Sequence, residues 1–266
     1  MYKDILDYTK MCKLKPMISV VTVVFNNVEN IERTIQSVIM QSFDEYEYII
    51  VDGGSIDGTV DLVKRYSEHV TKFVSEKDKG LYDAMNKGLS LCNGNFVVFM
   101  NSGDTFYDTD TLSRVAKEIG GDIDAIYGNH IVEHVDNKNK RNYIVSLPPS
   151  DSCLLRMPFC HQTLYIRREL ALKYKFDDRL RIGADFKQIV QLFNKDTFIK
   201  LDKPLAIVSN GGISDKERLN SVLERIAILR SLGLYTPKVS ILYYIEMANQ
   251  VIRLFLKNLL KYFRFI

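Results

Sequence analysis

Residues 18–25 read ISVVTVVF, a β-branched run without a charged side chain. Such a run predicts a strand that is buried on both faces, as in parallel sheets that carry helices on either side. Residues 29–41, ENIERTIQSVIMQ, follow with apolar side chains three or four positions apart, which predicts an amphipathic helix. The two segments indicate that the chain opens with a strand–helix unit.

The same alternation continues through the first half of the chain. Apolar runs at residues 48–51 (YIIV), 71–75 and 95–100 (NFVVFM) predict further strands, and residues 59–70, 81–91 and 109–119 predict helices. A strand–helix–strand order at this spacing indicates a parallel sheet with helices on both faces. In such a sheet, ligands bind beyond the carboxyl ends of the strands.

The second half is less regular. We expect strands at residues 125–135, 143–147, 163–166, 197–201 and 205–208, and helices at 184–193, 215–233 and from 238 to the end. The polar segment 136–141, DNKNKR, is expected to form the turn of a hairpin, and Pro148 and Pro149 to break the chain after it. The chain shows no internal repeat and no low-complexity stretch.

Polar side chains gather where the predicted strands of the first half end. Asn26, Asp52, Asp78 and Asp104 each follow an apolar strand or lie in the next loop. Asp, Asn and Gly also make ordinary turns, and for one such cluster alone the turn is the better interpretation. Four clusters on one edge of a sheet favour a ligand site.

Composition excludes several classes of protein. The 266 residues are 46% hydrophobic and 26% charged, which is typical of a globular chain and excludes disordered, collagen-like and coiled-coil proteins. A net charge of +3 is too small to indicate a nucleic-acid binder. Four cysteines without CxxC spacing fit a reduced, intracellular protein. The first 16 residues lack the apolar core of a signal peptide, and no run of 18 apolar residues predicts a membrane-spanning helix.

The first strand is not followed by a phosphate-binding glycine loop. Residues 25–30 read FNNVEN, so the GxGxxG fingerprint is absent there, and no Walker A motif occurs in the chain. A divalent metal is the alternative way to hold a diphosphate, and it needs only one or two carboxylates from the protein. Asp104, at the end of a predicted buried strand, is the best candidate, with a helix cap as its alternative role.

The segments around these residues resemble glycosyltransferase family two, in particular its non-processive members that build bacterial surface polysaccharides. The resemblance begins with VVTVVFNNVENIERTIQSVIMQSFDEYEYIIVDGGSIDGT and continues with EKDKGLYDAMNKGLSLCNGNFVVFMNSGDTF. The later pieces HQTLYIRR, GADFKQIVQLF and NGGIS fit the same subgroup, so it spans about residues 17–214. Several motifs in the family's order make the resemblance specific.

The resemblance implies an α/β chain with the A-type glycosyltransferase fold. This fold has a Rossmann-like, mostly parallel central sheet flanked by helices, here with a C-terminal helical extension. Residues 1–16 would be an N-terminal extension and residues 17–214 the catalytic domain, divided into a nucleotide-sugar half (17–105) and an acceptor half (106–214). Residues 215–266 would form C-terminal amphipathic helices. The family also implies a nucleotide-sugar donor, Mg or Mn, and inversion at the anomeric carbon.

The resemblance assigns roles to individual residues. Asp185 matches the catalytic base, and Asp104 matches the metal-binding residue of the DxD-type motif. The donor-binding positions are Phe25, Asn26, Asp52, Gly53, Asp78, Asp83, Lys87, Ser102 and Gly103. His161 and Gln162 would contact the diphosphate or the acceptor, although a satisfied, partly buried histidine is an equally good interpretation of His161. Lys87 is alternatively a solvated charge.

The chain departs from the family pattern at three places. The DxD-type motif is reduced to Ser102-Gly103-Asp104, which leaves one carboxylate, and the base-recognition pair is Asp52-Gly53 rather than two acids. Asp185 follows Gly183-Ala184, where many relatives have Glu-Asp. The chain has no Trp, so a QxxRW motif is absent, which argues against a processive synthase.

The last residues form a basic amphipathic pattern. Apolar side chains recur at steps of three or four, namely Ile241, Ile245, Ala248, Ile252, Phe255, Leu259 and Phe263. Arg253, Lys257, Lys261 and Arg264 fall together on the other side of the helix. Such a helix binds a membrane surface, or it packs on the domain or on a second copy in a homodimer. We favour the membrane surface.

The expected function is inverting, metal-dependent transfer of a sugar, with a UDP-sugar favoured by family habit, to a saccharide hydroxyl of a lipid-linked acceptor. The product would belong to a bacterial O-antigen, capsule or exopolysaccharide, and the enzyme would be cytoplasmic and peripheral at the inner face of the cell membrane. The alternatives are a nucleotidyltransferase, which would release pyrophosphate, and a non-catalytic nucleotide- or sugar-binding partner. No nucleic-acid partner is expected.

Overall fold

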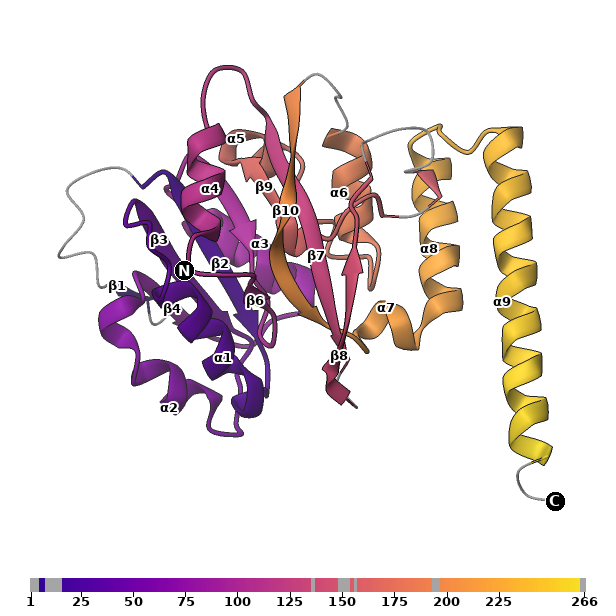
Figure 1. Cartoon of the computed structure of the whole chain (residues 1–266), viewed down its shortest axis with the longest axis horizontal. Coiled ribbons are helices and arrows are strands. Elements are labelled where there is room, and N and C mark those ends of the chain that lie inside the picture. Colours follow the sequence, from indigo (N-terminus) through magenta and orange to yellow (C-terminus); the bar gives the residue numbers. More distant parts are fainter. Residues whose placement is uncertain are drawn as a thin grey trace.

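The computed structural model describes residues 5–7, 16–134, 137–147, 154–155, 157–192 and 197–263. Its strands are β1 (Ile5–Asp7), β2 (Ile18–Val24), β3 (Tyr46–Asp52), β4 (Lys72–Ser75), β5 (Phe96–Phe99), β6 (Thr105–Phe106), β7 (Ala125–His134), β8 (Asn137–Ile144), β9 (Leu164–Arg167) and β10 (Phe198–Ser209). They form one mixed sheet in the order β1-β4-β3-β2-β5-β9-β7-β10-β6, and β8 pairs with β7 (Figure 1). The predicted break at Pro148 and Pro149 lies outside the described residues.

The centre of the sheet is parallel, as predicted. β2 pairs in parallel with β3 and with β5, so that Ile18 lies opposite Tyr46 on one side and Phe96 on the other. β4 continues the parallel set beside β3, and β10 pairs in parallel with β7. β9 runs antiparallel between β5 and β7. The carboxyl ends of the parallel strands therefore meet at one edge of the sheet.

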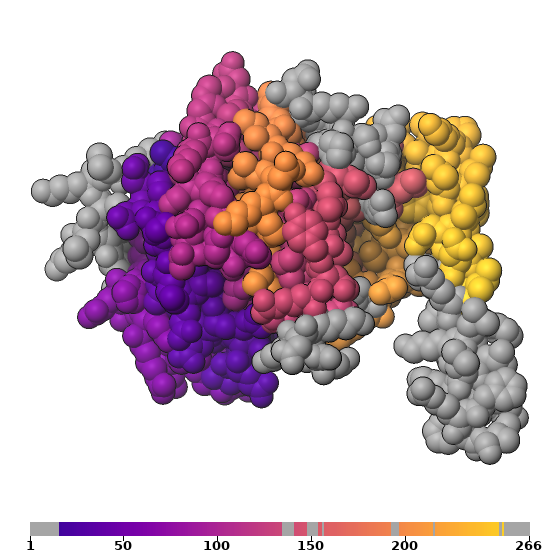
Figure 2. Space-filling model, viewed as in Figure 1, coloured from indigo at the N-terminus to yellow at the C-terminus, as the bar shows by residue number. Residues whose placement is uncertain are grey.

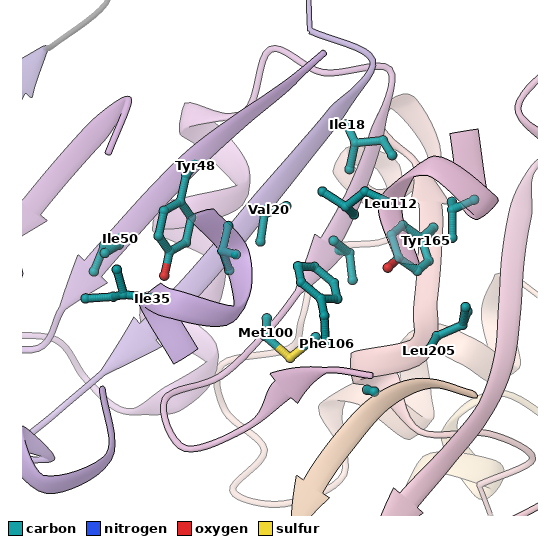
Figure 3. Close-up of a cluster of buried hydrophobic side chains, with 14 of the residues drawn as sticks. Ile18, Val20, Ile35, Tyr48, Ile50, Met100, Phe106, Leu112, Tyr165 and Leu205 are labelled. Atoms are coloured by element: carbon teal, nitrogen blue, oxygen red, sulfur yellow. The ribbon is translucent and has the colours of Figure 1, made fainter. Parts of the chain in front are cut away.

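Helices cover both faces of this sheet. One face carries α1 (Val28–Ile39), α2 (Thr59–Lys64) and α4 (Thr111–Glu118), and the other carries α3 (Leu81–Leu91), α5 (Arg168–Lys173) and α6 (Ala184–Leu192). Successive strand residues point to opposite faces. Accordingly, Val20 and Ile50 pack with Ile35 of α1 (Figure 3). Val21 and Ile49 pack with α3 on the other face. This two-sided burial explains why β2 and β3 are apolar at most of their positions.

The C-terminal helices share a core with the sheet domain. They are α7 (Ile213–Lys216), α8 (Arg218–Ser231) and α9 (Pro237–Phe263). Phe186 of α6, Leu229 of α8 and Tyr243 of α9 are buried in one apolar cluster, and the Tyr243 hydroxyl donates to the Leu154 carbonyl at 2.6 Å. Figure 2 shows the first part of α9, drawn in yellow, at the edge of the molecule. α9 contacts α8. Among the described residues, no helix combines the length and the apolar content needed to cross a bilayer.

Four predicted elements differ from the structure. The helix expected at 215–233 is divided at Glu217 into α7 and α8. The polar segment 136–141 was expected to form a hairpin turn, but β8 already begins at Asn137, since an edge strand that pairs only with β7 tolerates a polar sequence. The two strands expected at 197–201 and 205–208 are one strand, β10, in which a register shift between Leu201 and Ala206 accommodates Pro204. The helix expected at 59–70 ends at Lys64. The N–H groups of Arg65 and Tyr66 donate to the carbonyls three residues earlier in the chain, as in a 3-10 turn.

Candidate active site

A cavity of about 1030 Å³ opens at the carboxyl-end edge of the sheet. Six residues that were singled out from the sequence line it, namely Ser102, Gly103, Asp104, His161, Gln162 and Asp185. They come from the loop after β5, from the 3-10 turn η3 (His161–Thr163) and from the start of α6. The fold thus gathers segments that lie far apart in the sequence around one space.

Asp104 is the buried carboxylate of this cavity. Gln162 Nε2 donates to its Oδ2 at 2.6 Å, and the Ser209 N–H donates to its Oδ1 at 3.0 Å. Burial raises the pKa of Asp104 because it penalises the charged form, although these hydrogen bonds act in the opposite direction. No salt bridge to Asp104 is found among the described residues, so its negative charge is not neutralised by a contacting side-chain cation.

This environment fits a divalent cation that the protein holds through a single carboxylate. Mg²⁺ typically binds one or two protein carboxylates together with substrate phosphates and waters. Within the described part of the chain, no group of three His, Cys, Asp or Glu side chains forms a complete metal cage. Asp104 alone therefore suits a metal that arrives with a diphosphate, and it does not suit a permanently bound structural ion.

The backbone before Asp104 adopts a conformation that favours glycine. Gly103 has a φ of +101°, in the left-handed region that side chains with a Cβ rarely adopt. Its N–H donates to Thr34 Oγ1 at 2.9 Å, and the same hydroxyl donates to the Asp104 carbonyl at 2.7 Å. Asn27 Nδ2 donates to Ser102 Oγ at 2.9 Å. The Ser-Gly-Asp turn is thus attached to α1 and its N-terminal loop.

Asp185 is the second carboxylate of the cavity and lies in the first turn of α6. The Phe186 N–H donates to Asp185 Oδ1 at 2.8 Å, and the Tyr82 hydroxyl lies 3.3 Å from the same oxygen. Tyr82 comes from α3 and also donates to the Ile182 carbonyl. Burial and the nearby Asp185 charge raise the pKa of Tyr82, so the tyrosine stays protonated and acts as a donor. Oδ1 of Asp185 is therefore occupied, and Oδ2 faces His161.

His161 and Gln162 hold the two carboxylates from adjacent positions of one turn. His161 Nδ1 lies 3.3 Å from Asp185 Oδ2, while Gln162 donates to Asp104. Asn101 Nδ2 lies 3.0 Å from His161 Nε2. When Asn101 donates, Nε2 accepts and the ring proton is on Nδ1, directed at Asp185. A direct role of this pair at the diphosphate or the acceptor remains a prediction.

Glu224 of α8 fixes the loop that carries Asp185, and the sequence analysis missed it. Its carboxylate accepts hydrogen bonds from the N–H groups of Arg181, Ile182 and Gly183, at 2.8 to 3.0 Å. These groups lie 41 to 43 residues earlier in the chain. An isolated Glu on an amphipathic helix gives no sequence signal of such a contact, because it depends on tertiary packing.

The predicted donor-binding residues near β3 form a second group beside the cavity. Asp52 is fully buried, and its Oδ2 accepts from the Gly54 and Ser55 N–H groups and the Ser75 hydroxyl. A Cβ on Gly53 would lie 2.3 Å from Asp78 Oδ2 and 3.3 Å from the ring of Phe25. The structure therefore brings Phe25, Gly53 and Asp78 together, although none of them lines the cavity itself.

The remaining predicted donor residues have structural partners. Asn26 Oδ1 accepts from the Ile56 N–H at 2.9 Å, which joins the loops after β2 and β3. Lys87 forms ion pairs with Glu76 at 2.9 Å and with Asp83 at 3.3 Å. These contacts hold the 76–80 loop on α3. Contacts of Asn26, Asp83 and Lys87 with a donor remain predictions.

Two carboxylates in one cavity, beyond the carboxyl ends of a largely parallel sheet, are what the resemblance to the A-type glycosyltransferases implies for this chain. Residues 19–179 match the model of the glycosyl transferase family 2, and the chain belongs to this family. The resemblance inferred from the sequence is thereby confirmed. The matched region ends before Asp185.

Curated relatives extend over most of the chain. A PGL/p-HBAD biosynthesis glycosyltransferase of Mycobacterium bovis is 27% identical over 228 residues, which cover 82% of this chain and 87% of the relative. A cholesterol galactosyltransferase of Borreliella burgdorferi is 26% identical and covers 95% of this chain and 75% of its own length. The chain is thus similar to enzymes that are named for sugar transfer.

Solved structures show the same fold. Residues 1–349 of S. aureus TarS, in complex with UDP-GlcNAc, superpose with a TM-score of 0.64 at 21% identity, over 82% of this chain and 65% of that chain. A mannosyltransferase of Pyrobaculum calidifontis, in complex with GDP-Man and Mn²⁺, superposes with a TM-score of 0.63 at 18% identity, over 89% of this chain and 72% of that chain. The A-type fold is thereby confirmed.

Proposed function

We propose that the protein transfers a sugar, with inversion, from a nucleotide-sugar donor to a hydroxyl of a lipid-linked acceptor, with the help of a divalent metal. The observation that carries the proposal is the cavity that Asp104 and Asp185 line together. Asp104 is buried and has no ion-pair partner among the described residues, whereas Asp185 is partly exposed. This difference suits one carboxylate for a metal–diphosphate and the other for an acceptor hydroxyl.

The proposed reaction is an in-line displacement. The acceptor oxygen bonds to the anomeric carbon as the bond from this carbon to the diphosphate breaks, and the electron pair leaves with the nucleoside diphosphate. Asp185 takes the proton of the hydroxyl, through the oxygen that is not occupied by Phe186 and Tyr82. His161 and Tyr82 orient this carboxylate. A metal bound at Asp104 would stabilise the negative charge that develops on the leaving group.

The donor we propose is a UDP-sugar. TarS was crystallised with UDP and with UDP-GlcNAc, whereas the mannosyltransferase was crystallised with GDP-Man, so the fold serves both nucleotides. Asp52 Oδ1 is buried and has no hydrogen-bond partner among the described residues. An unmatched buried acceptor costs about 1–3 kcal/mol. An N–H of the donor base would remove this cost, which supports base recognition at Asp52.

The lipid-linked acceptor is inferred from the relatives. One of them is named for cholesterol as the group that it galactosylates. The resemblance to non-processive enzymes of bacterial surface polysaccharides supports a lipid-linked saccharide as the acceptor of this chain. An acceptor of either kind is a membrane lipid, which is consistent with the peripheral membrane location that we propose for the enzyme.

Calorimetric titration with nucleoside diphosphates, with and without Mn²⁺, tests the donor site. We expect UDP to bind only when the metal is present, and radiolabelled UDP-sugars then to release UDP rather than pyrophosphate. Release of pyrophosphate would indicate a nucleotidyltransferase. A folded sample that binds no nucleoside diphosphate would support a non-catalytic binding partner, for which the missing acid at Ser102 is the best argument.

We further propose that α9 attaches the enzyme to an anionic membrane surface. Ile241, Ile245 and Ile252 are each more than half exposed, whereas Val239 and Tyr243 of the same helix are buried. The basic side chains predicted for the opposite side, and the apolar ones from Phe255 onward, lie outside the described side chains. The exposed isoleucines therefore form an apolar face that the domain does not cover.

Replacing Ile241, Ile245 and Ile252 with serine together should lower sedimentation with anionic phospholipid vesicles at least tenfold, because these side chains would otherwise enter the interface. Deletion of residues 238–266 is the weaker test, since it removes Tyr243 from the core. Ile56→Ser is the control, because Ile56 is 91% exposed but lies in the loop between β3 and α2 and not on α9. Unchanged vesicle binding together with a loss of dimers would assign the face to a second copy instead.

A further inference from the structure

The part of the cavity lining beyond β8 and β10 includes apolar side chains that the proposed chemistry does not use, beside the polar Ser214 and Lys216. These apolar side chains are Ile144, Val145, Leu147, Met157 and Ile213, which we call the apolar shelf. Ile144 is the last residue of β8, and Ile213 is the first residue of α7. Ile144, Val145 and Ile213 are 38%, 55% and 40% exposed. Single exposed apolar side chains are ordinary, but a group of them around the mouth of a cavity indicates a binding surface.

Another wall of the cavity is polar. It is formed by Asn27, Asn30 and Ser102, which are joined by hydrogen bonds of 2.8 and 2.9 Å. This wall continues to Asp104, so it suits the polar diphosphate and the sugar of the donor. The segments after β2 and β5 carry the polar residues, and the segments after β8 and β10 carry shelf residues. β9 lies between these two groups of strands in the order of the sheet. The two walls therefore suit two different reactants.

Asp185 lines the same cavity as the apolar shelf. The position of the reacting hydroxyl at Asp185 therefore limits which part of the acceptor can contact the shelf. A hydroxyl that gives its proton to Asp185 must lie within about 2.6–3.2 Å of the carboxylate. The chemical group attached next to this hydroxyl then lies against the remaining walls of the cavity. A purely saccharide acceptor would leave the exposed apolar surface of Ile144, Val145 and Ile213 without an apolar partner, whereas an acceptor with an apolar group beside the hydroxyl would bury it.

We propose that the acceptor is an amphiphile whose apolar part is attached close to the reacting hydroxyl and packs on the apolar shelf. The inference rests on the proposed function and adds the substrate class: an alkyl, sterol or aryl glycoside, or a glycolipid with a short saccharide. A saccharide chain of many residues would hold its lipid too far from Asp185 to reach the shelf. A second copy packed on the shelf would compete with the acceptor for the same surface of the cavity.

Alkyl glycosides test the shelf without knowledge of the natural acceptor. In protein labelled with ¹³C at the isoleucine δ1 methyl groups and saturated with UDP and Mn²⁺, n-octyl β-D-glucopyranoside is titrated below its critical micelle concentration. We expect the signals of Ile144 and Ile213 to shift and those of Ile56 and Ile241 to stay. Methyl β-D-glucopyranoside, which lacks the chain, should leave all four signals in place at the same concentration.

The double variant Val145→Ser, Ile213→Ser should weaken octyl glucoside binding about tenfold, because less apolar surface is buried on binding. The unchanged signals of the other isoleucines would show that the variant is folded. Three results would each contradict acceptor binding at the shelf: equal shifts with the methyl glycoside, shifts confined to Ile241 of α9, or no shift at all. UDP binding by the same samples is measured separately. Its loss would refute the donor site, whereas retained UDP binding without an octyl effect would refute the shelf alone.

Discussion

Asp185→Asn should lower kcat for sugar transfer about 10²-fold or more, while the affinity for UDP stays within about threefold of the wild-type value. Asparagine has nearly the same shape, and its carbonyl oxygen can still accept the hydrogen bonds from the Phe186 N–H and the Tyr82 hydroxyl. It cannot take the proton of the acceptor. The loss should therefore appear in the chemical step and not in donor binding.

The measurement is single-turnover transfer from the radiolabelled UDP-sugar, beside calorimetry with UDP and Mn²⁺. Asp110→Asn is the matched control, since Asp110 also lies at the start of a helix but does not line the cavity. Near-normal transfer by Asp185→Asn would remove the assignment of the base. A comparable loss of UDP affinity would place Asp185 in the donor site.

Asp104→Ala should abolish the metal dependence of UDP binding and lower turnover about 10²-fold or more, because the protein loses its one carboxylate for the metal. The substitution also leaves Gln162 and the Ser209 N–H without their acceptor, so the free energy of unfolding should fall by about 1–3 kcal/mol. Asp104→Asn keeps one of the two acceptor oxygens, so it should lose less stability than Asp104→Ala while it loses the same carboxylate for the metal.

Calorimetry with UDP over a series of Mn²⁺ concentrations checks this prediction, and urea unfolding reports the stability of both variants. We expect both to bind UDP equally weakly with and without Mn²⁺. If either variant keeps metal-dependent UDP binding at the wild-type affinity, the metal is held elsewhere. In that case the single carboxylate of the Ser102-Gly103-Asp104 turn has only a structural role.

The sequence predicts the centre of the sheet well, for a physical reason. β2 and β3 contact helices on both faces, so nearly every side chain in them is apolar, and the pattern is visible without knowledge of the partners. The polar residues that end these strands are visible for the same reason. The sequence therefore indicates the edge where Asp52 and Asp104 lie, and the family resemblance adds Asp185.

Contacts that depend on tertiary packing could not be predicted in this way. β8 begins inside a polar segment because pairing with β7 satisfies its backbone whatever its side chains are. His161 and Gln162 were expected at the site, but their attachment to two different carboxylates follows from the position of η3 between β5 and β7. The apolar shelf likewise joins the end of β8 to the start of α7, which are far apart in the chain.

The contact of Glu224 with residues 181–183 bears on the order in which the enzyme becomes active. β2, β3, β4 and β5, which belong to the half that we propose to bind the donor, all precede residue 105 and pair in parallel among themselves. The base loop is tied in place by a helix that is synthesised about 40 residues after it. In a nascent chain, or in a fragment that ends before α8, the loop that carries Asp185 lacks the support of Glu224. We expect donor binding to arise before catalysis during biosynthesis.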